Sequence, residues 1–243
     1  MSTVDEMKPI IDLTIKSLSR AKFRVDPIGG DKYSRQTSII SSAYKRHGQI
    51  LEVAIRNRLS ECKYFDVGHE PTFKVSDIAD RAINGRNSDI PDSGLIELPY
   101  GSAGRNIQVD AFVFDRRINS LRCYEIKRGN GDFDAGKKRS LLRDILCAQS
   151  LLRSYGKTKG HDASIVEACV ICYFGVRALP EPLCLTATEL DDHFVFAVSE
   201  HVERVNEYFQ EQLYLLLETI SLDHDVDFQG LCPTCPVKSK RLN

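Results

Sequence analysis

Apolar residues alternate with other residue types along residues 107–114, a segment rich in Val, Ile and Phe. These residue types favour strands. Residues 121–127 show a similar alternation, and the polar stretch at residues 116–119 between them has the length of a hairpin loop. The pattern predicts two antiparallel strands joined by a short turn in the middle of the chain.

Longer segments on either side show apolar residues spaced three and four apart, which is typical of helices. These segments cover residues 4–20, about 36–61, about 136–155 and 200–220. The near-continuous apolar run at residues 164–174 predicts a strand that is covered on both faces. We also expect strands at 94–98 and 193–198 and a short helix at 77–82, while the rest of 62–92 lacks a clear pattern. This order of elements predicts an α/β fold with a central mixed β-sheet flanked by helices.

The hairpin places several polar side chains together if it is symmetric about its loop. Asp110 then lies opposite Glu125, and Gln108 lies opposite Lys127. Side chains alternate along a strand, so all four project from one face of the sheet. Two adjacent carboxylates repel each other unless a cation lies between them, and Mg²⁺ prefers oxygen ligands of this kind. A lysine beside such a metal can position an attacking water or stabilise charge in the transition state.

Asp110 followed by Glu125-Ile126-Lys127 resembles the signature of the PD-(D/E)XK nuclease superfamily, the restriction-endonuclease-like enzymes. Val109 stands where the signature has a proline. The tripeptide E-x-K also occurs at residues 6–8 and 61–63, but only the third copy is on a predicted strand with an aspartate facing it. The alternative to a nuclease site is a surface hairpin with an ordinary Glu–Lys ion pair.

The resemblance implies a restriction-endonuclease-like core and assigns roles to the hairpin residues. Asp110 and Glu125 are expected to hold Mg²⁺, for which Mn²⁺ can substitute, together with the carbonyl of Ile126. Lys127 is expected to position the water or stabilise the transition state, and Gln108 is expected to support the site.

Glu52 is a further candidate ligand that the resemblance implies. In the resembled family, a helix before the sheet often brings a glutamate to the metal, and residues 48–52 look like that helix. Glu52 lies on the apolar side of its predicted helix, where burial of an unpaired carboxylate is costly. We therefore expect it as a third acidic ligand. The alternative is an exposed glutamate or an ion pair with Arg56 one turn later.

The resemblance covers mainly residues 45–155, and 243 residues fit one domain. We expect a helical extension at 1–35, a catalytic core at 36–221 and a tail at 222–243. A sequence-specific type II restriction endonuclease is the first expectation, because the chain has no helicase or ATPase motif. Such enzymes cut both strands of double-stranded DNA, which predicts a homodimer. A repair or junction-processing nuclease, a ribonuclease and a non-catalytic nuclease-like DNA-binding subunit stay open as alternatives.

The net charge of −1 conceals a strong segregation of charge along the chain. Residues 20–58 carry nine Lys or Arg against three Asp or Glu, and residues 136–160 carry seven against one. Residues 181–227 carry one basic and twelve acidic side chains. A polyanion is attracted to the first two segments and repelled by the third, although solvated helix faces are the simpler alternative. The residues expected to contact nucleic acid are Lys45, Arg46, Lys137, Lys138, Arg139, Arg143 and Gln149.

Eight cysteines in a chain of this type do not suggest a disulfide framework. Cys123, Cys147 and Cys169 have apolar neighbours and are expected in the core. Cys169 and Cys172 are three apart on a predicted strand, so they should point to opposite faces and not chelate one metal. Cys232 and Cys235 form a C-P-x-C turn with no evident second pair, so we do not expect zinc or an iron–sulfur cluster there.

No apolar run approaches the roughly 20 residues that a membrane-spanning helix needs. The first ten residues, MSTVDEMKPI, lack the apolar stretch of a signal peptide. We therefore expect a cytoplasmic protein that makes no membrane contact.

Overall fold

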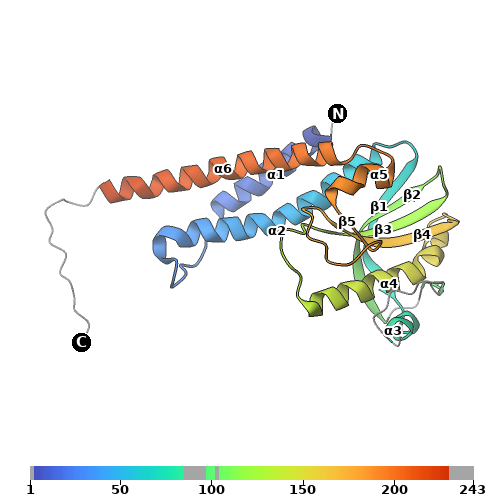
Figure 1. Cartoon of the computed structure of the whole chain (residues 1–243). Helices are drawn as coiled ribbons and strands as arrows, with labels where there is room; N and C mark the ends of the chain where they lie inside the picture. Colours follow the sequence, from blue (N-terminus) through green and yellow to red (C-terminus); the bar gives the residue numbers. More distant parts are fainter. Residues whose placement is uncertain (1–2, 85–96, 102–103, 230–243) are drawn as a thin grey trace, which may run out of the picture.

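A computed structural model describes residues 3–84, 97–101 and 104–229 (Figure 1). The helices are α1 (Thr3–Arg20), α2 (Gly30–Ser60), α3 (Asp77–Asn84), α4 (Ala135–Thr158), α5 (Leu190–Phe194) and α6 (Ser199–Gln229), with a short 3₁₀ turn at Ala187–Glu189. The strands are β1 (Phe65–Val75), β2 (Arg105–Asp115), β3 (Ser120–Lys127), β4 (Ile165–Cys172) and β5 (Cys184–Leu185).

The five strands form one mixed sheet in the order β1-β2-β3-β4-β5. The β1–β2 and β2–β3 pairs are antiparallel, whereas the β3–β4 and β4–β5 pairs are parallel. The predicted hairpin register is confirmed, because Phe114 pairs with Leu121 and Ala111 pairs with Tyr124. The α/β fold with a mixed sheet packed against helices is therefore as predicted.

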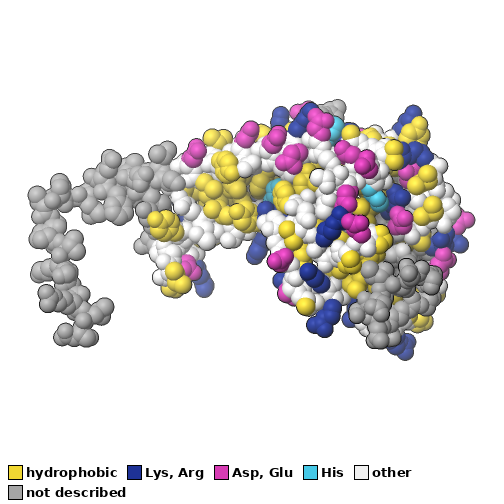
Figure 2. Space-filling model, viewed as in Figure 1, with side chains coloured by type: hydrophobic (Ala, Val, Ile, Leu, Met, Phe, Trp, Pro, Cys, Tyr) yellow, Lys and Arg dark blue, Asp and Glu magenta, His cyan; other side chains and the backbone are white. Residues whose placement is uncertain are grey.

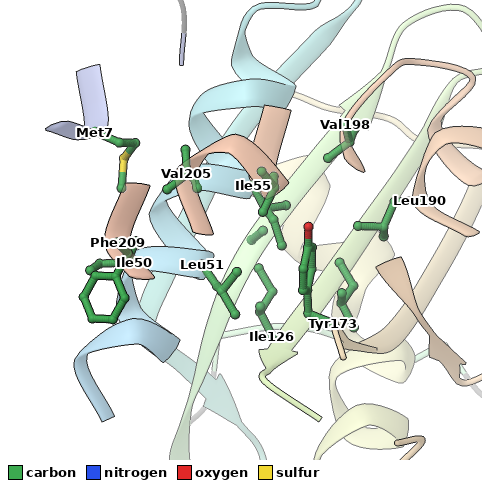
Figure 3. Close-up of a cluster of buried hydrophobic side chains, with 14 of the residues drawn as sticks. Met7, Ile50, Leu51, Ile55, Ile126, Tyr173, Leu190, Val198, Val205 and Phe209 are labelled. Carbon is green, nitrogen blue, oxygen red and sulfur yellow. The ribbon is translucent and has the colours of Figure 1, made fainter. Parts of the chain in front are cut away.

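Helices cover both faces of the sheet, with α1, α2 and α6 on one face and α4 on the other (Figure 1). On the first face, Leu51 and Ile55 of α2 and Val205 of α6 pack over Ile126 and Tyr173 of the sheet region (Figure 3). Three residues of α1 are fully buried in the same cluster: Met7, Ile11 and Leu18. The first helix is thus part of the core and not only an extension.

The second core lies between the sheet and α4, where Leu151 and Leu152 are fully buried. Cys172 belongs to this cluster, while Cys169 belongs to the cluster on the other face. The predicted opposite orientation of these two cysteines is confirmed. Cys123 and Cys147 are also buried core residues, as expected.

One predicted strand is wrong, and a second is absent from the part of it that the structure describes. Residues 193–198 contain the end of α5 and a left-handed residue, Val195, with φ of 49°. Asp191 accepts hydrogen bonds from the backbone N–H groups of Val198 and Ser199 at 2.7 and 2.8 Å, which fixes a turn into α6. Glu97 and Leu98 are not in a strand, and the preceding residues 94–96 lie outside the described part of the chain.

One edge of the sheet is formed by β1. This strand lies in a segment for which we predicted no regular structure apart from the short helix. Its register shifts between Gly68 and Glu70 and again between Glu70 and Phe73. These irregularities and Pro71 obscure the two-residue period, and an edge strand tolerates both. The short helix predicted at 77–82 is confirmed as α3.

Two helices are longer than their apolar patterns indicate. The helix expected from residue 36 begins at Gly30, and α6 runs to Gln229 past its expected end at 220. The predicted cysteine turn at Cys232 and Cys235 lies outside the described residues. Within the described residues, none of the helices combines the length and apolar character needed to cross a bilayer.

Candidate active site

Strands β2 and β3 separate at one end of the hairpin. Their ladder runs from Asp115–Ser120 to Ala111–Tyr124, and β3 then continues beside β4 as far as Lys127. We call residues 108–110 and 125–127, where the two strands part, the fork. Because the two backbones no longer pair at the fork, a side chain can form the hydrogen bond that a backbone group of the other strand would otherwise form.

Asp110 occupies the fork and is 2% exposed. Its Oδ2 accepts a hydrogen bond from the Ile126 N–H at 2.7 Å, and its Oδ1 accepts one from Gln108 Nε2 at 2.7 Å. The Asp110 carbonyl accepts a hydrogen bond from Arg56 Nη1 at 2.6 Å. A buried carboxylate is tolerated only with such partners. The side chain is therefore fixed in position, and Gln108 supports it as expected.

Glu125 and Lys127 lie side by side on β3, and the Lys127 ammonium donates to Glu125 Oε1. Burial and the negative charge of Asp110 raise the pKa of Glu125 above its ordinary value, although Lys127 opposes the shift. Burial works to lower the pKa of Lys127, but Glu125, Asp110 and Glu52 outweigh it and raise that pKa. The structure thus brings Asp110, Glu125 and Lys127 into one electrostatic group.

Glu52 reaches the same group from α2. Burial first, and then the charge of Asp110, raise the pKa of Glu52 to about 7, while Lys127 and Arg56 act in the opposite direction. Arg56 is directed at the Asp110 carbonyl, so it does more than pair with Glu52 one turn earlier on the helix. Glu52 therefore belongs to the fork's charge cluster, as the sequence suggested.

The carboxylates do not, however, form a ready-made ligand cluster. Among the described residues, no group of three or more His, Cys, Asp or Glu side chains is placed to hold a metal ion. Glu52 thus acts on Asp110 and Glu125 through its charge, and the expected third direct ligand is not assembled. Two carboxylates with a backbone carbonyl still match the oxygen donors of Mg²⁺, which keeps several waters.

The charge balance of the fork also fits a cation. Three carboxylates, from Glu52, Asp110 and Glu125, face the positive charges of Lys127 and Arg56. Two of the three acids have raised pKa values partly because the others are negatively charged. A divalent cation would relieve this repulsion.

A cavity of about 220 Å³ opens in front of the fork. Its walls come from residues 105–109 of β2, residues 123–125 of β3 and the middle of α4, at residues 141–148. Asp144 of α4 lines this cavity, lies 2.7 Å from Arg105 through its Oδ1 atom, and contributes to the raised pKa of Glu125. Neither Asp144 nor Arg105 was predicted, although Asp144 is the single acid in the basic segment 136–160.

The residues predicted to contact nucleic acid are placed in several different surroundings. Lys45 of α2 and Lys138 and Arg139 of α4 are exposed. Arg46 donates to the Thr14 carbonyl at 3.4 Å. Lys137 pairs with Asp134 at the start of α4, with 3.1 Å between Nζ and Oδ2.

Two of those residues make contacts that the sequence did not suggest. Arg143 forms an ion pair with Asp80 of α3, with 2.7 Å between Nη2 and Oδ2, so it holds α3 to α4. Gln149 lines a different cavity, at the edge of β4, together with Arg122 and Glu167. The helical pattern could not show this, because it gives no information on which strand edge a helix residue reaches.

Comparisons of this chain with protein-family models, with curated proteins and with solved structures found no match.

Proposed function

We propose that this protein is a divalent-metal-dependent endonuclease that hydrolyses phosphodiester bonds in DNA. The observation that carries the proposal is the fork, in which Asp110 is fixed by the Ile126 N–H beside the Glu125–Lys127 pair. This is the arrangement that the resemblance to PD-(D/E)XK nucleases implies for a working site.

Asp110, Glu125 and the carbonyl of Ile126 would hold Mg²⁺ or Mn²⁺. The bound ion would supply charge neutralisation for the scissile phosphate and acidify a coordinated water. Gln108 keeps the Asp110 carboxylate oriented, and Arg56 holds the backbone of the same residue. These two contacts pre-organise the site, which limits the reorganisation needed during the reaction.

Lys127 positions the attacking water and stabilises the negative charge that develops on the phosphate. Its raised pKa keeps the ammonium charged at neutral pH, which favours the electrostatic role over proton abstraction. Glu52 has a pKa of about 7, so it can accept or release a proton near neutral pH. We assign Glu52 the tuning of charge and proton transfer at the fork.

A sequence-specific, homodimeric type II restriction enzyme is the finer form of this proposal, and it rests on the resemblance. The cleavage products separate it from a repair or junction-processing enzyme. A restriction enzyme gives discrete plasmid fragments, whereas a repair enzyme gives nicks that depend on DNA structure.

The test is incubation of plasmid and phage DNA with the purified protein in Mg²⁺ and, separately, in EDTA. Wild-type protein should cleave only with Mg²⁺, and Asp110→Ala should not cleave. Asp66→Ala is the matched control, because Asp66 lies on β1 in an exposed ion pair with Arg116. Undiminished cleavage by Asp110→Ala, or DNA binding without any metal-dependent turnover, would contradict the proposal.

A further inference from the structure

A second cavity, of about 330 Å³, lies between α2 and α6, where hydrophobic side chains gather on the surface (Figure 2). It is distinct from the cavity at the fork and is formed by different residues. The residues used below are Tyr44, His47, Arg128, Phe174, Glu203 and Asn206.

Planar groups form a stack along one wall of this cavity. The Arg128 guanidinium carbon lies 4.5 Å from the centre of the Tyr44 ring and 5.6 Å from that of Phe174. Phe174 in turn stacks on His47, with 5.8 Å between ring centres and 18° between planes. Tyr44 is 48% exposed and Phe174 is 42% exposed. Exposed aromatic rings combined with an arginine are the usual platform for nucleobases of a single strand.

The cavity wall also holds buried polar atoms without partners. His47 is 5% exposed, and its Nε2 lies 3.0 Å from Asn206 Oδ1. Its Nδ1 and the Nε of Arg128 are buried and have no hydrogen-bond partner among the described residues. Buried polar atoms are nearly always satisfied, so two unsatisfied ones in one cavity wall point to a ligand with polar atoms.

The protonation state of His47 determines which hydrogen-bonding groups the ligand must carry. Burial, assisted by the positive charge of Arg128, lowers the pKa of His47 to about 4, so the ring is neutral at pH 7. With Nε2 donating to Asn206, the free Nδ1 is an acceptor, whereas Arg128 Nε is a donor. The acid in the same cavity, Glu203, is engaged by the Tyr173 hydroxyl and the Asn206 amide. A group with both donors and acceptors, such as a base with its phosphate, fits these atoms.

The cavity is close to the fork along the chain. Arg128 directly follows Lys127, and Tyr44 precedes Glu52 by eight residues on α2, or about 12 Å at 1.5 Å per residue. A DNA strand rises about 3.4 Å per nucleotide in the duplex, so this corresponds to roughly three or four nucleotides. The cavity is thus linked to the fork both along α2 and through the neighbouring residues Lys127 and Arg128.

We propose that the cavity between α2 and α6 binds an unpaired nucleotide of the substrate strand, with its base against Tyr44 and Phe174 and its phosphate near Arg128. This inference rests on the proposed nuclease function. It makes DNA with a single-stranded extension or unpaired base near the cut the preferred substrate.

The test measures binding without cleavage, by fluorescence anisotropy of labelled DNA in EDTA. A blunt duplex is compared with the same duplex carrying a four-nucleotide single-stranded extension. We expect the wild-type protein to bind the extended duplex about tenfold more tightly, as stacking of one base provides. Tyr44→Ala and Phe174→Ala should lose this difference and keep their affinity for the blunt duplex. Both residues are partly exposed, so the variants should fold.

Tyr64→Ala is the matched control, because Tyr64 is 42% exposed and lies outside the cavity. It should retain the preference for the extended duplex. Equal wild-type affinity for the two duplexes, or retention of the preference in Tyr44→Ala, would overturn the inference. The binding result does not depend on cleavage, so failure of the nuclease proposal would be seen separately in the plasmid assay.

A competition with deoxyadenosine monophosphate identifies the source of the nucleotide. If the base is recognised as part of a strand, the mononucleotide should compete only at concentrations far above those of the extended duplex. Displacement at comparable concentrations would assign the cavity to free nucleotides and contradict the assignment to a substrate strand.

Discussion

The fork and the exposed side of α4 both carry many charges, but they use them differently. At the fork, three carboxylates gather around Lys127 and Arg56, and two of the acids have raised pKa values. On α4, Lys137 pairs with Asp134 and Arg143 pairs with Asp80. These two charges of α4 each face an opposite charge, whereas the carboxylates at the fork also repel one another.

This difference supports placing the proposed chemistry at the fork. Structural ion pairs balance opposite charges, so each group has the protonation state it would have in water. Groups of like charge held close together against their repulsion are typical of functional sites. The fork has this property, and the more strongly basic helix does not. A high density of basic residues in the sequence is therefore a weaker guide to the site than a small convergence of acids with one lysine.

The largest expected effect is on the rate of DNA cleavage, and it is seen by replacing one lysine at the fork and one on α4. Lys127→Ala should reduce the rate of DNA cleavage by about 100-fold or more, because it removes a charge that stabilises the transition state. Lys138→Ala, on exposed α4 surface, should stay within about threefold of wild type. Single-turnover cleavage in Mg²⁺ measures both rates. Similar losses in the two variants would remove the distinction between fork and helix.

The next effect is on stability and depends on pH. The folded-state pKa of Glu52 is about 7, above the ordinary value of 4.5, so the native state binds more protons between these values. The free energy of unfolding should therefore fall as pH rises from about 4.5 to 7. Because Glu52 is only half-buried, we expect about 1–2 kcal/mol of this loss after allowance for solvent screening.

Urea denaturation of the metal-free protein at pH 5 and pH 8 measures this effect. Glu52→Gln should lose less stability than wild type over this interval, since the amide does not titrate. Mg²⁺ should restore part of the wild-type stability at pH 8, because it binds the folded state. An identical pH dependence of the free energy of unfolding in wild type and Glu52→Gln would show that the pKa of Glu52 is not raised at the fork.

A smaller effect is expected for the ion pair between α3 and α4. Arg143→Ala should lower the free energy of unfolding by about 0.5–1 kcal/mol, as is usual for partly exposed pairs. Cleavage of DNA by the folded variant should be unchanged. Thermal denaturation and the plasmid assay give the two values, and a selective loss of cleavage would support the predicted role of Arg143 at phosphate.

The smallest effect concerns the exposed basic residues of α4. Lys138→Ala and Arg139→Ala should each weaken DNA binding only a few-fold and lower the slope of log affinity against log salt by about one if they contact phosphate. Anisotropy titrations at several salt concentrations measure the slope. An unchanged slope would mean that these side chains are only solvated.

The sequence predicted features that depend on local periodicity. The hairpin register followed from alternation and loop length, and it placed Asp110 near Glu125. The orientation of Cys169 and Cys172 followed from the strand period in the same way. Glu52 was singled out by the resemblance, together with the cost of a carboxylate on an apolar helix side.

The features that the sequence did not reveal depend on partners far away in the chain. Strand β1 is irregular and is defined by pairing with β2, about forty residues later. The surroundings of Arg143 and Gln149 were not foreseen, because Asp80 and the edge of β4 decide where those side chains lie. The pair of Arg105 and Asp144 joins a strand to a helix that the hairpin separates. No local pattern contains this information.

The central claim is that the fork binds a divalent metal, and calorimetric titration of Mn²⁺ tests it without knowledge of the substrate. Wild-type protein should bind Mn²⁺ with heat that Asp110→Ala loses, while Asp66→Ala behaves as wild type. Equal Mn²⁺ binding by wild type and folded Asp110→Ala, or no binding by wild type, would contradict the account of the fork as a metal-dependent active site.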